Sequence, residues 1–169
     1  MARKIGAVYL AYFVVVILAT VISGLGSHAA GDILEFCSYG LYALLVVAFY
    51  RFFEPVDRSL SFAAAVVGIL GCIIGVLGAL HRAPYNLSQL LFFAFFDMLI
   101  GWLIVKSTLL PRAFGILMIV AGVGWLLYLA PGSVALAPYI AALGIVAEVA
   151  LMLRLLIAGS TYDRVQVPS

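Results

Sequence analysis

The sequence predicts an all-α membrane protein, a bundle of six transmembrane helices in antiparallel order. Hydrophobic residues make up 67% of the 169-residue chain and charged residues only 9%, whereas soluble domains average roughly 45–50% and about 25%. Six long apolar stretches follow one another, separated by short connections. Because no connection is long enough to carry a second fold, we expect residues 1–169 to form a single integral membrane domain.

The basic residues predict how this bundle is oriented. If the chain crosses the bilayer six times, only Arg82 falls on one side. The other side then carries Arg3, Lys4, Arg51, Arg58, Lys106, Arg112, Arg154 and Arg164. Because positive charge is retained on the cytoplasmic side during insertion, both termini are predicted to be cytoplasmic. Without a basic run, the chain is not expected to bind nucleic acid.

Each predicted span is close to the roughly 20 residues that cross a hydrocarbon layer of about 30 Å. The first follows Arg3 and Lys4 as a signal peptide would, but its apolar run from Ile5 to Ile22 is longer than a usual h-region, so we expect a retained helix. Prolines fall in the connections or in first turns, and none interrupts a span. The predicted ranges are 5–26, 32–53, 60–81, 86–107, 111–130 and 138–158.

The third span, 60–81, is marked by four glycines at spacings of three, four and three residues, which places them on one stripe: Gly68, Gly71, Gly75 and Gly78. Such a stripe lets another helix approach closely. Packing within the same bundle is favoured over homodimerisation. Aromatic residues near the two faces fit the interfacial belts of a membrane protein: Tyr50, Phe52 and Phe53 at the inner face, and Tyr85, Tyr128 and Tyr139 at the outer face.

Acidic side chains are costly in a bilayer, so each one needs a reason. Every span that runs from outside to inside carries one: Glu35, Asp97 and Glu148. At 1.5 Å per residue, Asp97 and Glu148 are predicted about 16 and about 15 Å below the outer helix ends, close to the midplane. Such a pair could hold a proton, a cation or a ligand amine, because two close carboxyls cannot both ionise. The alternative, slightly favoured, is that both only hydrogen-bond to neighbouring helices.

Polar residues continue from these acids towards the outer side. One stripe lies on the second span and another on the fourth, and together they predict a polar funnel that opens outward and ends near Asp97 and Glu148. Its members are Asp32, Glu35, Tyr39, Tyr42, Asn86 and Gln89, with His28, His81 and Arg82 at the rim.

No metal or cofactor is predicted, because two histidines at a membrane surface are a weak signal for ligation. His28 and His81 remain weak candidates. Cys37 and Cys72 lie inside apolar segments and are expected to be free thiols, although a disulfide between them remains an alternative.

Three segments resemble the DUF4386 family of bacterial six-span membrane proteins: Leu41-Tyr42-Ala43 with the loop 51–60, residues 103–124, and the acidic last helix 148–159. The resemblance implies a bacterial inner-membrane protein. It implies no activity, because the function of that family is undefined.

No catalytic motif is present, so the chain is not expected to be an enzyme. The leading expectation is a non-enzymatic binding or accessory subunit, in contact with membrane-protein partners or with further copies of itself. The alternative is a ligand-binding or proton-coupled carrier that uses Asp97 and Glu148. A weaker alternative is an enzyme acting on lipid or quinone at the outer leaflet with His28 and His81.

Overall fold

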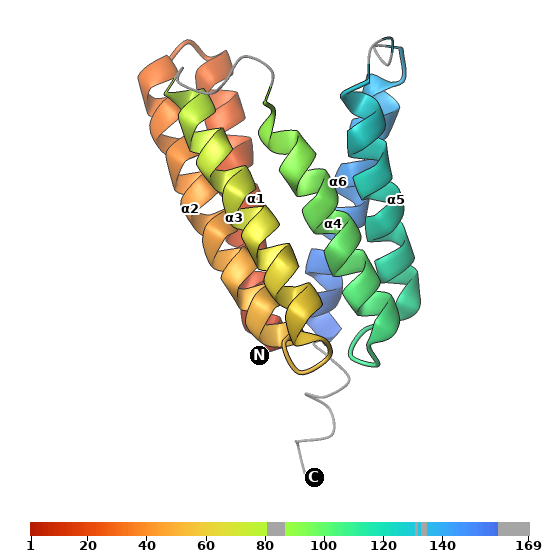
Figure 1. Ribbon diagram of the computed structural model, residues 1–169. Coiled ribbons are helices and arrows are strands. Elements are labelled where there is room, and N and C mark those ends of the chain that lie inside the picture. The colour runs from red at the N-terminus through yellow and green to blue at the C-terminus, as the bar shows by residue number, and fades with distance from the viewer. Residues whose placement is uncertain (81–86, 131, 133–134, 159–169) are drawn as a thin grey trace.

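The computed structural model describes residues 1–80, 87–130, 132 and 135–158, and this part of the chain is helical without any strand (Figure 1). The all-α prediction is therefore confirmed. The helices are α1 (Ala2–Gly24), α2 (His28–Phe53), α3 (Arg58–Ala79), α4 (Gln89–Lys106), α5 (Arg112–Tyr128) and α6 (Ala137–Leu153), and the π-helical turn η2 (Arg154–Ala158) continues α6.

Five of the helical segments are long and apolar enough to cross a membrane: α1, α2, α3, α4 and the segment Ala137–Ile157. The sixth, α5, has 17 residues, which span about 26 Å. It is shorter than the predicted range 111–130 because Pro111 precedes the helix and Leu129 ends it. Conversely, α2 begins four residues before the predicted position 32, so His28 and Asp32 lie within its first turns.

Large apolar side chains cover much of the outer surface. Ile17 is 58% exposed, Phe62 61% and Trp102 57%. Exposed apolar residues on this scale would be a liability in water, whereas lipid is a suitable solvent for them. This surface therefore supports the assignment to a membrane.

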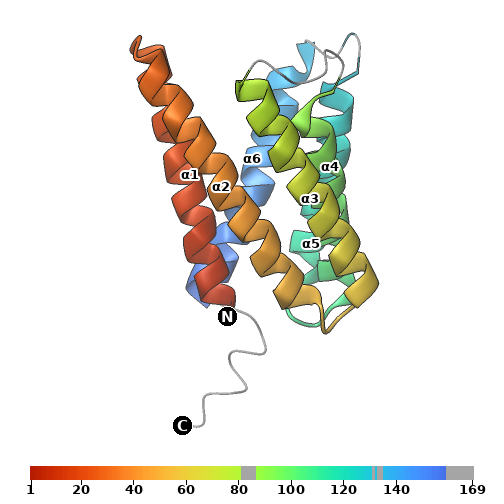
Figure 2. The ribbon, with the colours of Figure 1, turned by 60° about the vertical axis from the view of Figure 1, so that its left-hand side comes forward.

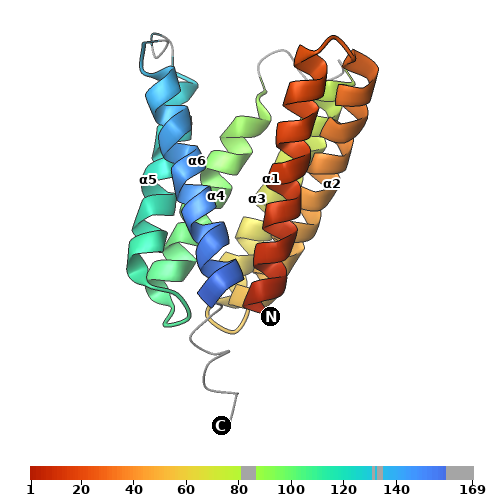
Figure 3. The ribbon, with the colours of Figure 1, turned by 180° about the vertical axis from the view of Figure 1, so that it is seen from behind.

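Helices that follow one another in sequence pack side by side, from α1 against α2 through to α5 against α6. The ring is completed by α1, which contacts both α6 and η2 (Figure 3). The start of α1 and the connections at 54–57 and 107–111 lie at one end of the bundle, the lower end in Figure 1. From there the ribbons of α1 and α2 diverge from those of the other helices towards the upper end (Figure 2).

Glycines set the closest approach between α4 and α5. A methyl group on Gly101 would meet the carbonyl oxygen of Gly115 at 2.6 Å, and one on Gly122 would meet the carbonyl oxygen of Ala94 at the same distance. No side chain fits there without moving a backbone. Because lipid gives no hydrophobic drive to join two helices, such close backbone packing is a main source of attraction between them.

The glycine stripe of α3 is filled by side chains of this same chain. A methyl group on Gly68 would meet Val46 at 2.7 Å, one on Gly71 would meet Phe93 at 2.6 Å, and one on Gly75 would meet the Tyr39 ring. Gly78 has no such neighbour within 4 Å. The stripe therefore packs inside the bundle, against residues of α2 and α4, over three of its four glycines.

A polar junction ties the lower end together. Asp57 caps α3 by accepting a hydrogen bond from the Leu60 amide at 3.0 Å. Lys106, the last residue of α4, donates to the other Asp57 oxygen at 2.7 Å. These two hydrogen bonds, first the one from the Lys106 ammonium, lower the pKa of Asp57 below its ordinary value.

Candidate functional site

The most unusual polar group in the described part of the chain is the carboxyl of Asp97, in the middle of α4. Asp97 is only 1% exposed, and neither of its carboxyl oxygens has a hydrogen-bond partner among the described residues. Buried polar groups are nearly always hydrogen-bonded, and a buried carboxylate without a partner is very costly. A proton or a bound ligand is therefore needed to offset the cost of burying the Asp97 carboxyl.

Glu148, on α6, is the second member of the site. It lies close enough to Asp97 for the two carboxyls to interact electrostatically. The Tyr9 hydroxyl of α1 donates a hydrogen bond to Glu148 Oε2 at 3.0 Å. The two acids thus interact but differ in their surroundings, because Glu148 is only half-buried and has a donor, whereas Asp97 is enclosed.

An aromatic layer from three helices surrounds this pair. The Tyr12 and Tyr42 rings lie 5.0 Å apart, and Tyr42 contacts Phe93 at 4.6 Å and Phe96 at 5.8 Å between ring centroids. Tyr9, Tyr12 and Tyr42 each interact electrostatically with both carboxyls. The phenolic side chains of α1 and α2 therefore face the acids of α4 and α6.

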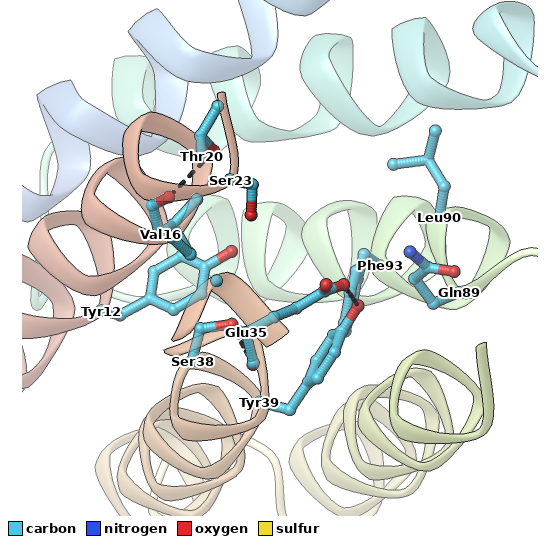
Figure 4. Close-up of a pocket in the computed structure, with 12 residues that line it drawn as sticks. Tyr12, Val16, Thr20, Ser23, Glu35, Ser38, Tyr39, Gln89, Leu90 and Phe93 are labelled. Atoms are coloured by element: carbon cyan, nitrogen blue, oxygen red, sulfur yellow. Dashed lines mark hydrogen bonds between the residues drawn. The ribbon is translucent and has the colours of Figure 1, made fainter. Parts of the chain in front are cut away.

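A pocket of about 390 Å³ lies between α1, α2 and α4 (Figure 4). Its wall combines polar and apolar side chains. Its lining residues include Tyr12, Thr20, Glu35, Ser38, Tyr39, Gln89 and Phe93. The Glu35 carboxylate accepts a hydrogen bond from the Tyr39 hydroxyl at 3.1 Å, one helical turn further along α2.

Tyr12 connects the pocket with the carboxyl pair. It lines the pocket and interacts electrostatically with Asp97 and Glu148. Neither acid lines the pocket itself. The predicted funnel is thus divided in two, with an upper pocket and, behind the aromatic layer, the two carboxyls.

The structure brings together some of the predicted site residues and separates others. Glu35, Tyr39 and Gln89 line the pocket, whereas Tyr42 is buried in the aromatic layer. Asp32 and His28 are exposed on the first turns of α2. Asn86, His81 and Arg82 lie outside the described residues.

The cysteines do not bond to each other. Cys37 is an exposed free thiol on α2, and Cys72 is a buried free thiol on α3. Within the described part of the chain, no group of three or more His, Cys, Asp or Glu side chains is placed to hold a metal ion.

Sequence reasoning missed the contribution of α1. Tyr9 and Tyr12 stand three residues apart in an apolar helix without an acidic residue, so they share one face. Two phenols on one face of a membrane helix were the available signal. Their acidic partners, however, are remote in sequence, the Tyr9–Glu148 bond joining residues 139 positions apart.

The family model described as "Domain of unknown function (DUF4386)" matches residues 76–159. Over these residues the chain is similar to the DUF4386 family. The match confirms the resemblance for the segments 103–124 and 148–159, and the quoted segment at 41–60 lies outside it. The DUF4386 region holds α4, α5 and α6 with both carboxyls, whereas α1 and α2 supply Tyr9, Tyr12 and Glu35 from outside the region. Neither the curated proteins nor the solved structures gave a match.

Proposed function

We propose that this chain is a six-span protein of the bacterial inner membrane, with both termini cytoplasmic, that holds a proton or a cation on Asp97 and Glu148. The pocket between α1, α2 and α4 is the outer entrance to this site and receives a small ligand. The protein is thus a ligand-binding or proton-coupled carrier.

The distribution of charge supports this orientation. The connections at 54–57 and 107–111 share the lower end of Figure 1 with the start of α1. Arg51, Arg58, Lys106 and Arg112 flank these two connections. By the positive-inside rule this end faces the cytoplasm, so the pocket near the other end faces outward.

The buried Asp97 carboxyl carries the functional part of the proposal. An acid kept only to join helices would hydrogen-bond to a neighbour, and Asp97 has no such partner among the described residues. An acid that binds a proton or cation has a reason to remain unpaired within the protein. Because Glu148 is close by, simultaneous ionisation of both groups is unfavourable, so the pair retains a proton or attracts a cation.

Infrared spectroscopy of the protein in proteoliposomes tests this proposal. We expect the carbonyl band of a protonated carboxylic acid at neutral pH, and we expect Asp97→Asn to remove or strongly shift it. Asp57→Asn, a matched change at the cytoplasmic end, should keep the band. The apparent Tm of Asp97→Asn should be unchanged or higher, because no hydrogen bond within the protein is lost. An unchanged band, or a large fall in Tm, would contradict the proposal.

An accessory subunit, the leading expectation from the sequence, is the alternative function. The glycine stripe of α3 offers such a partner little surface, because side chains of α2 and α4 lie against Gly68, Gly71 and Gly75. Native mass spectrometry after gentle extraction distinguishes the two functions. A chain that flies with a small-molecule adduct supports the binding protein, whereas larger proteins that stay attached would support the accessory subunit.

A further inference from the structure

We propose that the pocket between α1, α2 and α4 binds an organic cation, a protonated amine or quaternary ammonium with a small apolar body, with Glu35 as its counter-ion. This deepens the proposed function by naming the class of ligand, and it rests on that function only in placing the pocket at the outer side. The evidence comes from charge, from hydrogen-bonding capacity and from the aromatic wall.

The charge of the pocket is negative. Among the described residues that line it, Glu35 is the one acid, and none is basic. The Tyr39 hydroxyl holds its carboxylate at the pocket wall (Figure 4). Because a carboxylate has about four acceptor sites, this one hydrogen bond leaves capacity for a cationic ligand.

Three of the five hydroxyl groups that line the pocket favour a cation over an anion. The Thr20 hydroxyl donates to the Val16 carbonyl at 2.9 Å, the Ser38 hydroxyl to the Glu35 carbonyl at 2.7 Å, and the Tyr39 hydroxyl to Glu35. A hydroxyl has one proton and two lone pairs. Because each of these three hydroxyls already donates its proton within the protein, it can only accept a hydrogen bond from a ligand. An ammonium ligand, which is positively charged, is attracted by these free acceptor oxygens.

Aromatic faces complete the site. Tyr12, Tyr39 and Phe93 come from three different helices and line the pocket. A cation within about 6 Å of such a ring is attracted by its quadrupole. Two of the rings are held by the glycine stripe, because Phe93 rests on Gly71 and Tyr39 on Gly75. The glycines of α3 therefore seat the aromatic wall.

The volume sets the size of the ligand. About 390 Å³ lies near the lower end of the range of roughly 300–1,000 Å³ for small-molecule sites. One ring with a trimethylammonium group fits this range. Benzyltrimethylammonium is therefore a suitable probe, and neopentylbenzene is its neutral isostere.

Equilibrium binding of radiolabelled benzyltrimethylammonium to the full chain tests the inference. The protein is kept in a maltoside, because phosphocholine detergents carry a quaternary ammonium of their own. We expect saturable binding that neopentylbenzene does not compete. Glu35→Gln keeps the acceptor for Tyr39 and should weaken binding at least about tenfold. Phe93→Leu should weaken it roughly 2- to 30-fold. Glu54→Gln, the same change at the opposite end, should bind as the wild type does.

The outcomes separate this inference from the proposed function. Wild-type affinity in Glu35→Gln would overturn the inference. If Asp97→Asn loses probe binding while Glu35→Gln still binds the probe, the cation is held by the carboxyl pair. That result would overturn the inference and keep the proposed function. If Glu35→Gln loses probe binding and Asp97→Asn leaves the infrared band unchanged, the cation pocket is supported and the proton site is rejected.

The same ammonium chemistry is offered by a soluble amine and by the headgroup of phosphatidylethanolamine. Nanodiscs of phosphatidylglycerol, with and without phosphatidylethanolamine, distinguish the two sources. Equal probe binding in both identifies a soluble cation as the ligand, whereas competition by phosphatidylethanolamine identifies the headgroup. Both results support an ammonium site, and absence of probe binding in either lipid would reject it.

Discussion

At the scale of single residues, the two carboxyls at the centre of the bundle illustrate how environment gives similar groups different roles. Glu148 accepts a hydrogen bond from Tyr9, so its charge is partly compensated by the protein. Asp97 has both oxygens buried without a partner among the described residues. A proton or cation shared by the pair is therefore most needed at Asp97, and Tyr9 fixes the position of the other acid.

The Tyr9→Phe substitution tests the value of that hydrogen bond. Removal of the hydroxyl leaves Glu148 Oε2 without its donor, and we expect the free energy of unfolding to fall by about 1 kcal/mol. Detergent-titration unfolding measures this change. Tyr139→Phe is the matched control, because Tyr139 is 73% exposed and should tolerate the loss. Equal stability of the two variants would show that the Tyr9 bond contributes nothing.

At the scale of helices, the pairs are joined where side chains are smallest. Gly101 and Gly115 bring the backbones of α4 and α5 together, and Gly6 does the same for α1 and η2, where a methyl group would meet the Leu156 backbone at 2.5 Å. Asp97 projects from α4 and Glu148 from the helix that η2 extends. The close contacts therefore fix the helices that carry the site.

A pair of Gly→Ala substitutions distinguishes the glycines that are needed for packing from those that are not. Gly101→Ala forces α4 and α5 apart, and we expect a loss of about 1–3 kcal/mol in unfolding free energy. Gly40 lies within α2 with no neighbour within 4 Å of an added methyl group, so Gly40→Ala should gain about 0.5–1 kcal/mol from reduced backbone freedom. The same unfolding titration compares the two, and a similar effect of both would contradict this account.

The junction between α3 and α4 gives a dependence on pH. Because the pKa of Asp57 is lowered in the folded protein, its bond to Lys106 is present above the ordinary pKa of 3.8. Its contribution to stability is then lost as the pH falls through the lowered value. Asn is also a good N-cap, so Asp57→Asn should remove the ion pair and retain the helix cap. We expect the variant to have a lower Tm than the wild type at neutral pH, and expect this gap to close in acid.

At the scale of the whole molecule, the bundle has two different ends. The lower end in Figure 1 carries the Asp57–Lys106 pair and the flanking basic residues. The other end opens into the polar pocket between α1, α2 and α4. A molecule with this polarity can expose its pocket to one side of a membrane only, so its orientation decides which compartment supplies the ligand.

Cysteine labelling in intact cells tests that orientation. In a Cys37→Ala/Cys72→Ala background, Ser27→Cys lies between α1 and α2 and Ser59→Cys lies in the first turn of α3, both at exposed positions. A membrane-impermeant maleimide should label Ser27→Cys directly and Ser59→Cys only after permeabilisation. The reverse pattern would place both termini outside and turn the pocket towards the cytoplasm.

Several parts of the site could be predicted from the sequence because charge in an apolar span is conspicuous. Glu35, Asp97 and Glu148 stand out by type alone, and a rise of 1.5 Å per residue predicts similar depths for the last two. The division between pocket and carboxyl pair could not be predicted, since it depends on Tyr12 and Tyr42 meeting across α1 and α2. The antiparallel packing of α4 on α5 was predicted, but the glycines that set its close approach were missed, because Gly101 and Gly115 form no recognisable stripe within one helix.

The sequence by itself determined that the chain is helical and apolar, where its connections fall and which acids interrupt its spans. These are local properties, set by composition and by periodicity along the chain. Only the tertiary structure decided which faces meet. It filled the glycine stripe of α3 with aromatic rings of α2 and α4, placed Tyr9 on Glu148, and left Asp97 unpaired among the described residues. The reason is physical: each of these outcomes depends on the rotation of helices about their axes, which is set by packing between residues far apart in sequence.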